Sequence, residues 1–480
     1  MKTKRLFLPI LILLFFVFQS NAQIINFEEA QQIAKQCLGE ILSKNSQNIK
    51  LEEEYFSKEN NSEPVYYIFN EKSGGYVIIS AEFKTVPVLG YSSNAYISNN
   101  TDEWSPEFTY WLGNYEEQII DLRQKNLNPT PVAIFQRNKL ENGESLGLMP
   151  TKDVAPLLAT TWNQGCGYNA LCPADGAGPC GRVYTGCVAT AMAQVIRYNE
   201  HPVNGIGDKC YTHYVYGEQC ADFAAATYDY STMPNASGNP EVAELMFHCG
   251  VSVNMDYSPS GSGAYSSSVV TAYRNYFDYK NAVILAKTSY TDDVWNRILR
   301  EEIDNNRPFY YAGQGSSGGH AFVFDGYQGL DYFHINWGWG GSQNGYFYCS
   351  DLSPGSYDFT SSQRAIIGAI PSSLFVNMNT FSSTELTCAT PVSQDLATGN
   401  DYYNYYKNTY PVTPGKELIY HFTTTLPGRI RVKITNSSDG SLYAMLFNYQ
   451  HQDSLINYGT NNLVLDDMPP GTYYLVIESS

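Results

Sequence analysis

The sequence predicts an α+β protein of three successive parts: a small α+β domain, a central domain of helices and paired strands, and a β-sandwich. Apolar residues recur at helical spacing in residues 26–41, 105–122 and 188–196. Short β-rich runs, punctuated by Gly and Pro turns, occupy residues 320–337 and the chain from about residue 377 onwards. A length of 480 residues suits about three domains.

Residues 1–22 have the composition of an export signal. Lys2, Lys4 and Arg5 precede an apolar run over residues 6–18, and small residues follow it. The apolar run is short for a membrane span, and no later segment approaches one. We therefore expect a secreted protein without a membrane span, either released or retained at the cell surface.

Charge and cysteine content restrict the possible partners. The formal net charge of -18 argues against nucleic acid and anionic membranes. Ten cysteines in an exported chain predict disulfides, such as Cys172 with Cys180 or Cys210 with Cys220, although the spacing leaves the connectivity open. A zinc site is disfavoured because the sequence has no CxxC pair and no nearby histidine doublet.

The N-terminal part shows clear helix starts. Asn26 precedes a helical run with Glu29 three residues later, as in a capping box. Ser105 followed by Pro106 begins a second amphipathic helix. Between the two helices, β-rich runs within residues 64–80 predict a hairpin.

Residues 125–152 are polar, contain Pro and Gly, and have weak periodicity. We expect an exposed connecting segment there, with proteolytic cleavage in or near residues 149–153. The expected domains are therefore residues 23–152 with the linker, residues 153–372, and a β-sandwich at residues 373–480. The role of the β-sandwich stays open between substrate adhesion, surface retention and no part in catalysis.

Cys187 lies where a Gly-led turn meets an apolar helical run that ends near Asn199. At a helix N-terminus, unpaired backbone N–H groups and the macrodipole favour a thiolate, the nucleophilic form of cysteine. Buried structural cysteines and disulfides are commoner, so this position alone leaves both roles open.

A nucleophilic thiol needs a base, and His320 opens a Gly-led, β-rich run. A second run follows after a tight loop at residues 327–329, which predicts a hairpin. That register pairs residue 320 with Asn336 unless a bulge shifts it. An amide at this place can accept the imidazole N–H and select its tautomer.

Gln164 lies in a Gly-flanked turn ahead of Cys187. Its amide can join the Cys187 backbone N–H as a donor to an oxyanion, although a loop glutamine is usually only solvated. Trp337 and Trp339 either shield the histidine from water or simply belong to an aromatic core.

The segments WNQG, TGCVATAMAQVIRY, GGHAFVFDGY and HINWGWGG, in this order, resemble the streptopain family of secreted cysteine peptidases, which are papain-like. The resemblance covers residues 153–371 and includes VSVNMDYSPSGSGAYSSS, which resembles the family's stretch along the substrate cleft. It implies a papain-like domain with a helical part and an antiparallel β part. The preceding domain is similar in placement to the family's inhibitory propeptide, which implies a zymogen.

The resemblance also implies roles for individual residues. The implied catalytic residues are the nucleophile Cys187, the general base and acid His320, the oxyanion donor Gln164, and Asn336 with Trp337 as groups that orient the histidine. The implied substrate contacts are Gly319, Ser260, Gly261, Ser262, Gly263 and Trp339. The register around Gly263 and the cysteine-rich stretch before Cys187 depart from the family's pattern.

We therefore expect a cysteine endopeptidase that acts on protein and peptide substrates, with its propeptide as intramolecular inhibitor and a monomeric mature form. Acyl transfer to water through a thioester needs no metal or organic cofactor. Two alternatives remain: an acyl transferase of transglutaminase or transpeptidase type, and a catalytically silent surface adhesin. The adhesin predicts loss of Cys187, His320 or Gln164, and all three are present.

Overall fold

The computed structural model describes residues 24–58, 63–148, 153–280, 282–315, 318–350, 352 and 363–372, and beyond them only strands between residues 384 and 479. The expected export signal at residues 1–22 lies outside the described residues, as do residues 149–152 of the expected cleavage segment. Within the described part, no helix is both long enough and apolar enough to cross a membrane.

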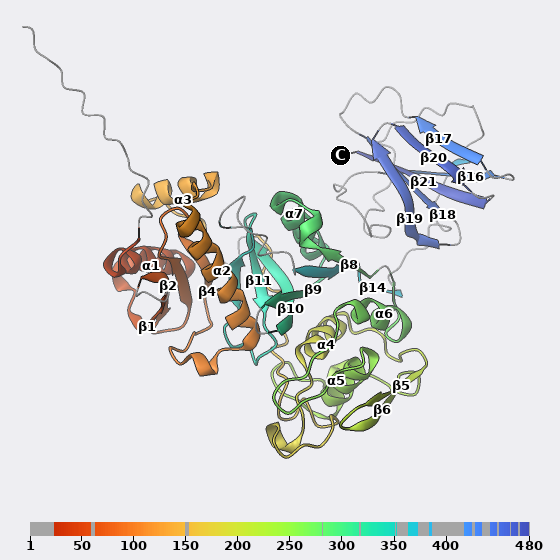
Figure 1. The fold of residues 1–480 in the computed structure, drawn as a ribbon, viewed down its shortest axis with the longest axis horizontal. Coiled ribbons are helices and arrows are strands. Elements are labelled where there is room, and N and C mark those ends of the chain that lie inside the picture. Colours follow the sequence, from red (N-terminus) through yellow and green to blue (C-terminus); the bar gives the residue numbers. More distant parts are fainter. Residues whose placement is uncertain are drawn as a thin grey trace, which may run out of the picture.

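The N-terminal domain consists of two long helices packed on an antiparallel sheet (Figure 1). Helix α1 (Phe27–Ile41) begins at Asn26, whose side chain accepts the Glu29 N–H at 2.9 Å. Helix α2 (Pro106–Lys125) begins at Ser105, with proline in its first turn. The predicted helices and hairpin are confirmed. The strands, paired in chain order, are β1 (Leu51–Lys58), β2 (Pro64–Glu71), β3 (Tyr76–Ser80) and β4 (Val88–Ser92).

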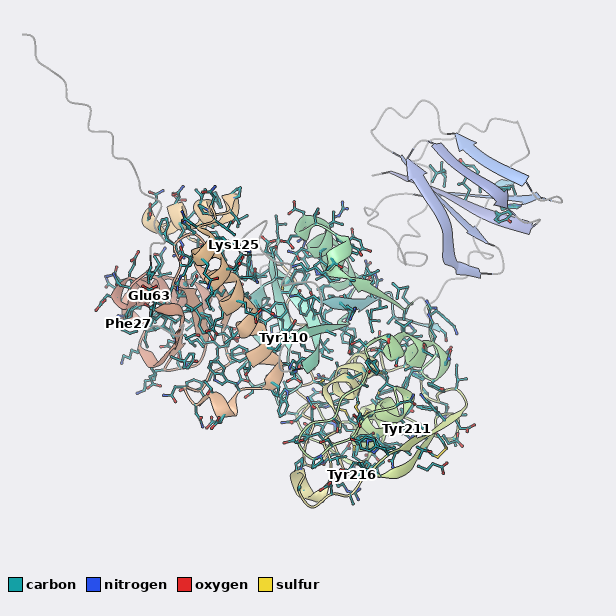
Figure 2. The ribbon with its side chains drawn as sticks, in the orientation of Figure 1. Phe27, Glu63, Tyr110, Lys125, Tyr211 and Tyr216 are labelled. Atoms are coloured by element: carbon teal, nitrogen blue, oxygen red, sulfur yellow. A yellow bond between two sulfur atoms is a disulfide. The ribbon has the colours of Figure 1, made fainter. Side chains whose placement is uncertain are left out.

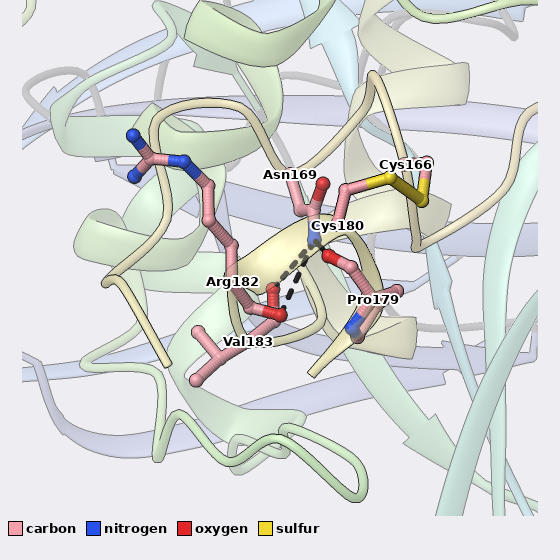
Figure 3. The surroundings of a disulfide bond; sticks show 6 residues. All are labelled: Cys166, Asn169, Pro179, Cys180, Arg182 and Val183. Carbon is pink, nitrogen blue, oxygen red and sulfur yellow. Dashed lines mark hydrogen bonds between the residues drawn. A yellow bond between two sulfur atoms is a disulfide. The ribbon is translucent and has the colours of Figure 1, made fainter. Parts of the chain in front are cut away.

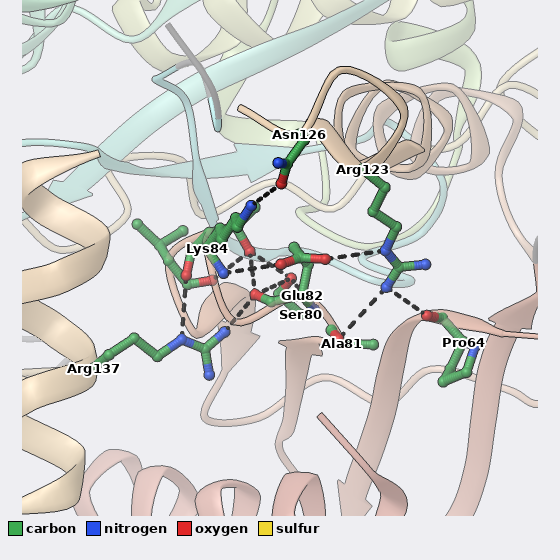
Figure 4. A network of polar contacts seen from close by, with 10 residues as sticks. Pro64, Ser80, Ala81, Glu82, Lys84, Arg123, Asn126 and Arg137 are labelled. Carbon is green, nitrogen blue, oxygen red and sulfur yellow. Dashed lines mark hydrogen bonds and ion pairs between the residues drawn. The ribbon is translucent and has the colours of Figure 1, made fainter. Parts of the chain in front are cut away.

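A third helix, α3 (Pro131–Glu141), occupies part of the segment that the sequence predicts to be an exposed connection. Most of α3 is exposed, as expected, but the sequence did not predict the helix. The Thr130 side chain caps its N-terminus. Arg137 is 4% exposed and donates hydrogen bonds to the backbone oxygens of Thr85 and Glu82 (Figure 4). Because a buried arginine rather than an apolar stripe docks this helix, hydrophobic periodicity does not reveal it.

The helical half of the central domain is built around α4, which is buried along its length from Cys187 to Ile196. Helix α4 contacts α5 and strand β10, which explains why it is buried on every side. The elements of this half are α4 (Cys187–Asn199), the hairpin β5 (Asp208–His213) and β6 (Gly217–Asp222), α5 (Pro240–Ser252) and α6 (Ser267–Asn275).

A ten-stranded sheet in the order β1-β2-β3-β4-β12-β11-β10-β9-β13-β8 runs through both domains. Strand β4 meets β12 with Gly90 opposite Phe347. A side chain at Gly90 would meet the Phe347 ring at 2.7 Å, so glycine permits this junction. The remaining elements of the central domain are β7 (Tyr279–Lys280), β8 (Val283–Ala286), α7 (Asp292–Asp304), β9 (Phe309–Gly315), β10 (Gly318–Gln328), β11 (Tyr332–Asn336), β12 (Gly345–Tyr348), β13 (Arg364–Ile367) and β14 (Ile370–Pro371).

The central domain contains two disulfides, Cys166–Cys180 and Cys210–Cys220. The second confirms the prediction, whereas the suggested pairing of Cys172 with Cys180 is wrong. Asn169 donates its side-chain N–H to the backbone oxygens of Pro179 and Val183, which folds the loop back on itself (Figure 3). In that fold Cys172 faces the core as a buried free thiol.

The strands described beyond residue 372 form two sheets, as expected for a β-sandwich. One has the order β15-β16-β21-β18-β19, and the other pairs β17 with β20. Tyr473 and Leu475 of strand β21 are buried. The strands are β15 (Thr384–Glu385), β16 (Glu417–Thr424), β17 (Gly428–Lys433), β18 (Leu442–Asn448), β19 (His451–Thr460), β20 (Asn462–Met468) and β21 (Gly471–Ser479).

Candidate active site

Cys187 is the first residue of α4, as the sequence predicts. Gly186 precedes it with a φ of 91°, in the region that favours glycine. A side chain on Gly186 would also meet Met255 Sδ at 2.7 Å and the Ser262 backbone oxygen at 2.9 Å. Glycine therefore allows the start of α4 to contact the loop that carries Ser262, one of the expected substrate contacts.

The other expected substrate contacts lie in two places. Ser260 and Gly261 form an exposed tip of the Ser262 loop, and Gly263 pairs with Asp256 at its base. Gly319 is exposed on β10, directly before His320. One group thus borders the start of α4, and the other borders the histidine.

His320 lies on β10, opposite Gly313 of β9. The Cys187 thiol lies next to the same strand. The backbone N–H of Ala321, the residue after His320, bonds to the thiol and lowers its pKa. The start of α4 and the part of β10 that carries His320 therefore lie close together, although they are far apart in the chain.

Burial suppresses the charged forms of both groups. It raises the pKa of Cys187 to about 12, with a further rise from Glu107, against the lowering effect of nearby backbone N–H groups. Burial also lowers the pKa of His320 to about 4. Near neutral pH the pair is a thiol and an uncharged imidazole, so the nucleophilic thiolate is scarce in the full-length chain.

Helix α2 of the N-terminal domain covers this pair. The ring of Tyr110 lies 5.4 Å from the His320 ring, between centroids. Figure 2 shows Tyr110 where α2 meets the central domain. Gly313 makes room for it, since a side chain there would come within 2.1 Å of the Tyr110 hydroxyl oxygen. The histidine is therefore shielded by an aromatic residue from outside its own domain.

Gln164, the expected oxyanion donor, is also engaged by α2. It is 4% exposed, and its Nε2 donates to Glu107 Oε1 at 3.4 Å. The other oxygen of Glu107 accepts a hydrogen bond from Trp339 Nε1. Burial raises the pKa of Glu107 to about 8, although the bonds from Trp339 and Gln164 act in the opposite direction. A carboxyl group from the N-terminal domain thus binds the side chain expected to bind an oxyanion.

The predicted register of the hairpin that carries His320 is wrong. Strand β10 has a bulge between Phe324 and Gly326, and Asn336 lies opposite Val323 rather than residue 320. The loop also comes later than expected, with Gln328 paired to Tyr332. The later loop alone would place Asn336 opposite Phe324, and the bulge moves it by one residue, to Val323.

Asn336 and Trp337 are both buried. They lie at the end of β11 and directly after it, next to the strand that carries His320. The Asn336 amide nitrogen donates to the Thr160 backbone oxygen at 2.8 Å and to Gln194 Oε1 at 3.2 Å. The Trp337 ring is fully buried and lies 4.9 Å from the Phe322 ring. These contacts make Trp337 part of an aromatic core, which is one of its two interpretations from the sequence; the other is a shield for the histidine.

Sequence reasoning missed Glu107, Tyr110 and Gln194. The first two lie in the first turns of α2. In a sequence, an acidic residue at that place indicates an interaction with the helix dipole, and an aromatic residue indicates core packing. The sequence does contain an indication of Gln194, because it is a polar residue inside the apolar run of α4. A buried amide in such a run needs hydrogen-bond partners from elsewhere in the fold.

The suppressed ionisation of Cys187 leads to a first prediction. At pH 7, iodoacetamide should alkylate Cys187 at least about tenfold more slowly in the full-length chain than after removal of residues 23–152, because the thiolate is the reacting form. Mass spectrometry of the Cys187 peptide over time measures both rates. Equal rates would mean that the N-terminal domain does not keep the thiol protonated.

Comparisons with known proteins agree with this arrangement. Residues 162–347 match the Peptidase C10 family, and residues 22–119 match the Spi protease inhibitor family. Streptopain of Streptococcus pyogenes is 31% identical over 334 residues, 64% of this chain and 80% of streptopain. The thiol protease/hemagglutinin PrtT of Porphyromonas gingivalis is 30% identical over 411 residues, 77% of this chain but only 44% of PrtT. A solved prointerpain A fragment of Prevotella intermedia matches with a TM-score of 0.55 and 34% identity, covering 67% of this chain and 99% of that one.

A thiol at a helix N-terminus, beside an antiparallel strand that carries a histidine in an α+β fold, is typical of the class of papain-like cysteine peptidases. Within that class, the chain belongs to the Peptidase C10 family, which includes streptopain, and it carries a protease-inhibitor domain ahead of the peptidase domain. The resemblance seen in the sequence is confirmed.

Proposed function

We propose that the processed protein is an endopeptidase that hydrolyses peptide bonds in protein substrates through a thioester on Cys187. The observation that carries this proposal is the approach of Cys187, at the start of α4, to the strand that carries His320. Gln164 lies beside the same helix start, because its backbone oxygen accepts the Thr185 N–H at 3.0 Å.

The reaction has two halves. His320 takes the Cys187 thiol proton as the sulfur attacks the peptide carbonyl carbon, and Gln164 Nε2 and the Cys187 backbone N–H donate hydrogen bonds to the oxygen that gains negative charge. Protonated His320 gives that proton to the leaving amine as the C–N bond breaks and the thioester forms. Neutral His320 then takes a proton from water, whose oxygen attacks the thioester. The C–S bond breaks, the carboxylic acid leaves, and His320 returns the proton to the Cys187 sulfur.

The N-terminal domain blocks both parts of this site in the zymogen. Tyr110 covers His320, and Glu107 takes the Gln164 hydrogen bond that the oxyanion requires. The Glu107 carboxyl group has the chemistry of the acid released by peptide hydrolysis, which accounts for its fit beside an oxyanion donor. Removal of the domain exposes the histidine and frees the donor.

Contacts made by the residues that follow 149–152 support cleavage close to residue 153. Val154 pairs with Tyr327, and the Leu158 N–H donates to Asp325 Oδ2 at 3.1 Å. Residues from Val154 onwards are therefore tied to the peptidase domain, so cleavage ahead of them leaves that domain complete.

The wider setting of the enzyme follows from the sequence. The basic and apolar start of the chain supports export, and the net charge of -18 argues against a nucleic-acid partner. The mature enzyme acts as a monomer outside the cell, and the role of its β-sandwich stays open between substrate adhesion, surface retention and no part in catalysis.

An epoxide inhibitor of papain-like enzymes tests the nucleophile. Casein hydrolysis by the processed protein should fall in proportion to a single adduct on Cys187, measured by mass spectrometry. A primary amine added with a peptide substrate separates hydrolysis, which yields a carboxylic acid, from acyl transfer, which yields an amide. Activity that survives full modification of Cys187, or an amide as the main product, would contradict the proposal.

A further inference from the structure

The proposed mechanism does not use Gln194, a buried polar side chain on the helix that begins with Cys187. Gln194 is 0% exposed and follows Cys187 by seven residues on α4. Seven residues are about two helical turns, so the two side chains leave the helix on the same face. A polar group at this depth costs stability unless all of its hydrogen bonds are made.

Both polar atoms of the Gln194 amide are hydrogen-bonded, and their partners come from two other segments. Its oxygen accepts hydrogen bonds from Thr160 Oγ1 at 3.0 Å, the Trp162 backbone N–H at 3.3 Å and Asn336 Nδ2 at 3.2 Å. Its nitrogen donates to Asn336 Oδ1 at 3.3 Å. The two side-chain amides therefore form a reciprocal pair.

This pair determines how the Asn336 amide is oriented. Both Asn336 Nδ2 hydrogens are used, on the Thr160 backbone oxygen and on Gln194. The Asn336 oxygen accepts the Gly338 backbone N–H at 3.1 Å in addition to Gln194 Nε2. A rotated amide would place N–H groups against these donors and lose several bonds at once.

Each partner segment is next to a residue of the proposed active site. Trp162 precedes the oxyanion donor Gln164 by two residues, and Asn336 ends the strand paired to the one that carries His320. Gln194 itself is on the helix that begins with Cys187. It is thus hydrogen-bonded to the segments behind both the oxyanion donor and the histidine.

We propose that Gln194 is a positioning residue of the peptidase, which holds the Thr160–Gln164 segment and Asn336 in register with Cys187. The inference rests on the proposed roles of Cys187, Gln164 and His320. Small displacements of groups that bind a transition state lower the rate of chemistry more than they lower substrate affinity.

The test compares variants of the processed enzyme, with rates expressed per active site titrated by the epoxide inhibitor. Gln194→Leu removes every bond at similar volume and should lower kcat about 10- to 100-fold with little change in KM. Gln194→Glu keeps the accepted bonds but loses the donated one, and should lower kcat about fivefold. If Gln194→Leu does not fold, Gln194→Glu alone carries the comparison.

Ile196→Ala is the matched control, because Ile196 is equally buried on α4 but has no polar contact to lose. It should lower the unfolding temperature and leave kcat per titrated site within about twofold of the wild type. A kcat for Gln194→Glu equal to the wild type, or an equal loss of kcat in Ile196→Ala, would overturn the positioning role. If a Cys187→Ala enzyme cleaved the substrate at the wild-type rate, the proposed function, rather than the role of Gln194, would be overturned.

Discussion

Replacing Cys187 by alanine is expected to abolish peptide hydrolysis by the processed protein, with kcat/KM lowered at least about 10³-fold. The change removes the atom that forms the thioester, while the oxyanion donors and the substrate contacts stay in place. In the full-length chain, the same change should prevent self-processing, so that the protein keeps residues 23–152. Casein hydrolysis and the chain length on a gel measure the two effects.

Cys249→Ala is the matched control for this substitution. Cys249 is a free, fully buried thiol of the same core but lies on α5. Its loss should lower the unfolding temperature through a small cavity and leave kcat/KM near the wild-type value. If Cys187→Ala cleaved casein as the wild type does, another residue would be the nucleophile.

Replacing Glu107 by glutamine should remove a pH-dependent weakening of the contact between the N-terminal domain and the active site. Burial raises the pKa of Glu107 to about 8 in the docked domain. The docked state therefore holds a proton that an exposed glutamate releases near its ordinary pKa of about 4.3. Glutamine fills the same space and stays uncharged at every pH.

The sign follows from linkage between protonation and docking. Because the docked pKa is the higher one, docking is strongest below the pKa of an exposed glutamate and weakens as the pH rises towards about 8. Within that window, the docking equilibrium falls by up to about tenfold per pH unit. Alkaline conditions therefore favour release of the inhibitory domain.

Unfolding temperatures of the full-length Cys187→Ala protein, which cannot process itself, measure this effect. Between pH 5 and pH 8, the additional Glu107→Gln change should become progressively more stabilising. Glu117→Gln, on the exposed face of the same helix, is the control and should show no such trend. If Glu107→Gln shifted the unfolding temperature by the same amount at every pH, Glu107 would not be buried as an acid in the zymogen.

The sequence was most informative where a short stretch of chain determines its own structure. The caps at Asn26 and Ser105 and the start of α4 after Gly186 depend on neighbouring residues, and all three are found as predicted. Helix α3 was missed because its docking depends on Arg137, whose acceptors lie on a distant loop. Hydrophobic periodicity within a short segment cannot indicate a hydrogen-bond partner that lies far away in the chain.

Contacts between distant segments were the weaker part of the prediction. The hairpin loop after β10 comes two residues later than expected, which displaced Asn336 from the position opposite His320. The disulfide of Cys180 goes to Cys166 rather than Cys172 because the intervening loop turns inward at Asn169. In both cases several pairings agree with the sequence, and packing selects one of them.

The amino-acid order alone therefore identifies a cysteine peptidase with an inhibitory domain and predicts Cys187 and His320 as its nucleophile and base, because the motifs that carry this chemistry are contiguous stretches. Only the tertiary structure decides what those groups touch. Glu107 reaches Gln164 across 57 positions of the chain, and Gln194 reaches Asn336 across 142. Those contacts arise from the joining of two domains through one sheet and from the burial of α4, and no local sequence pattern encodes either.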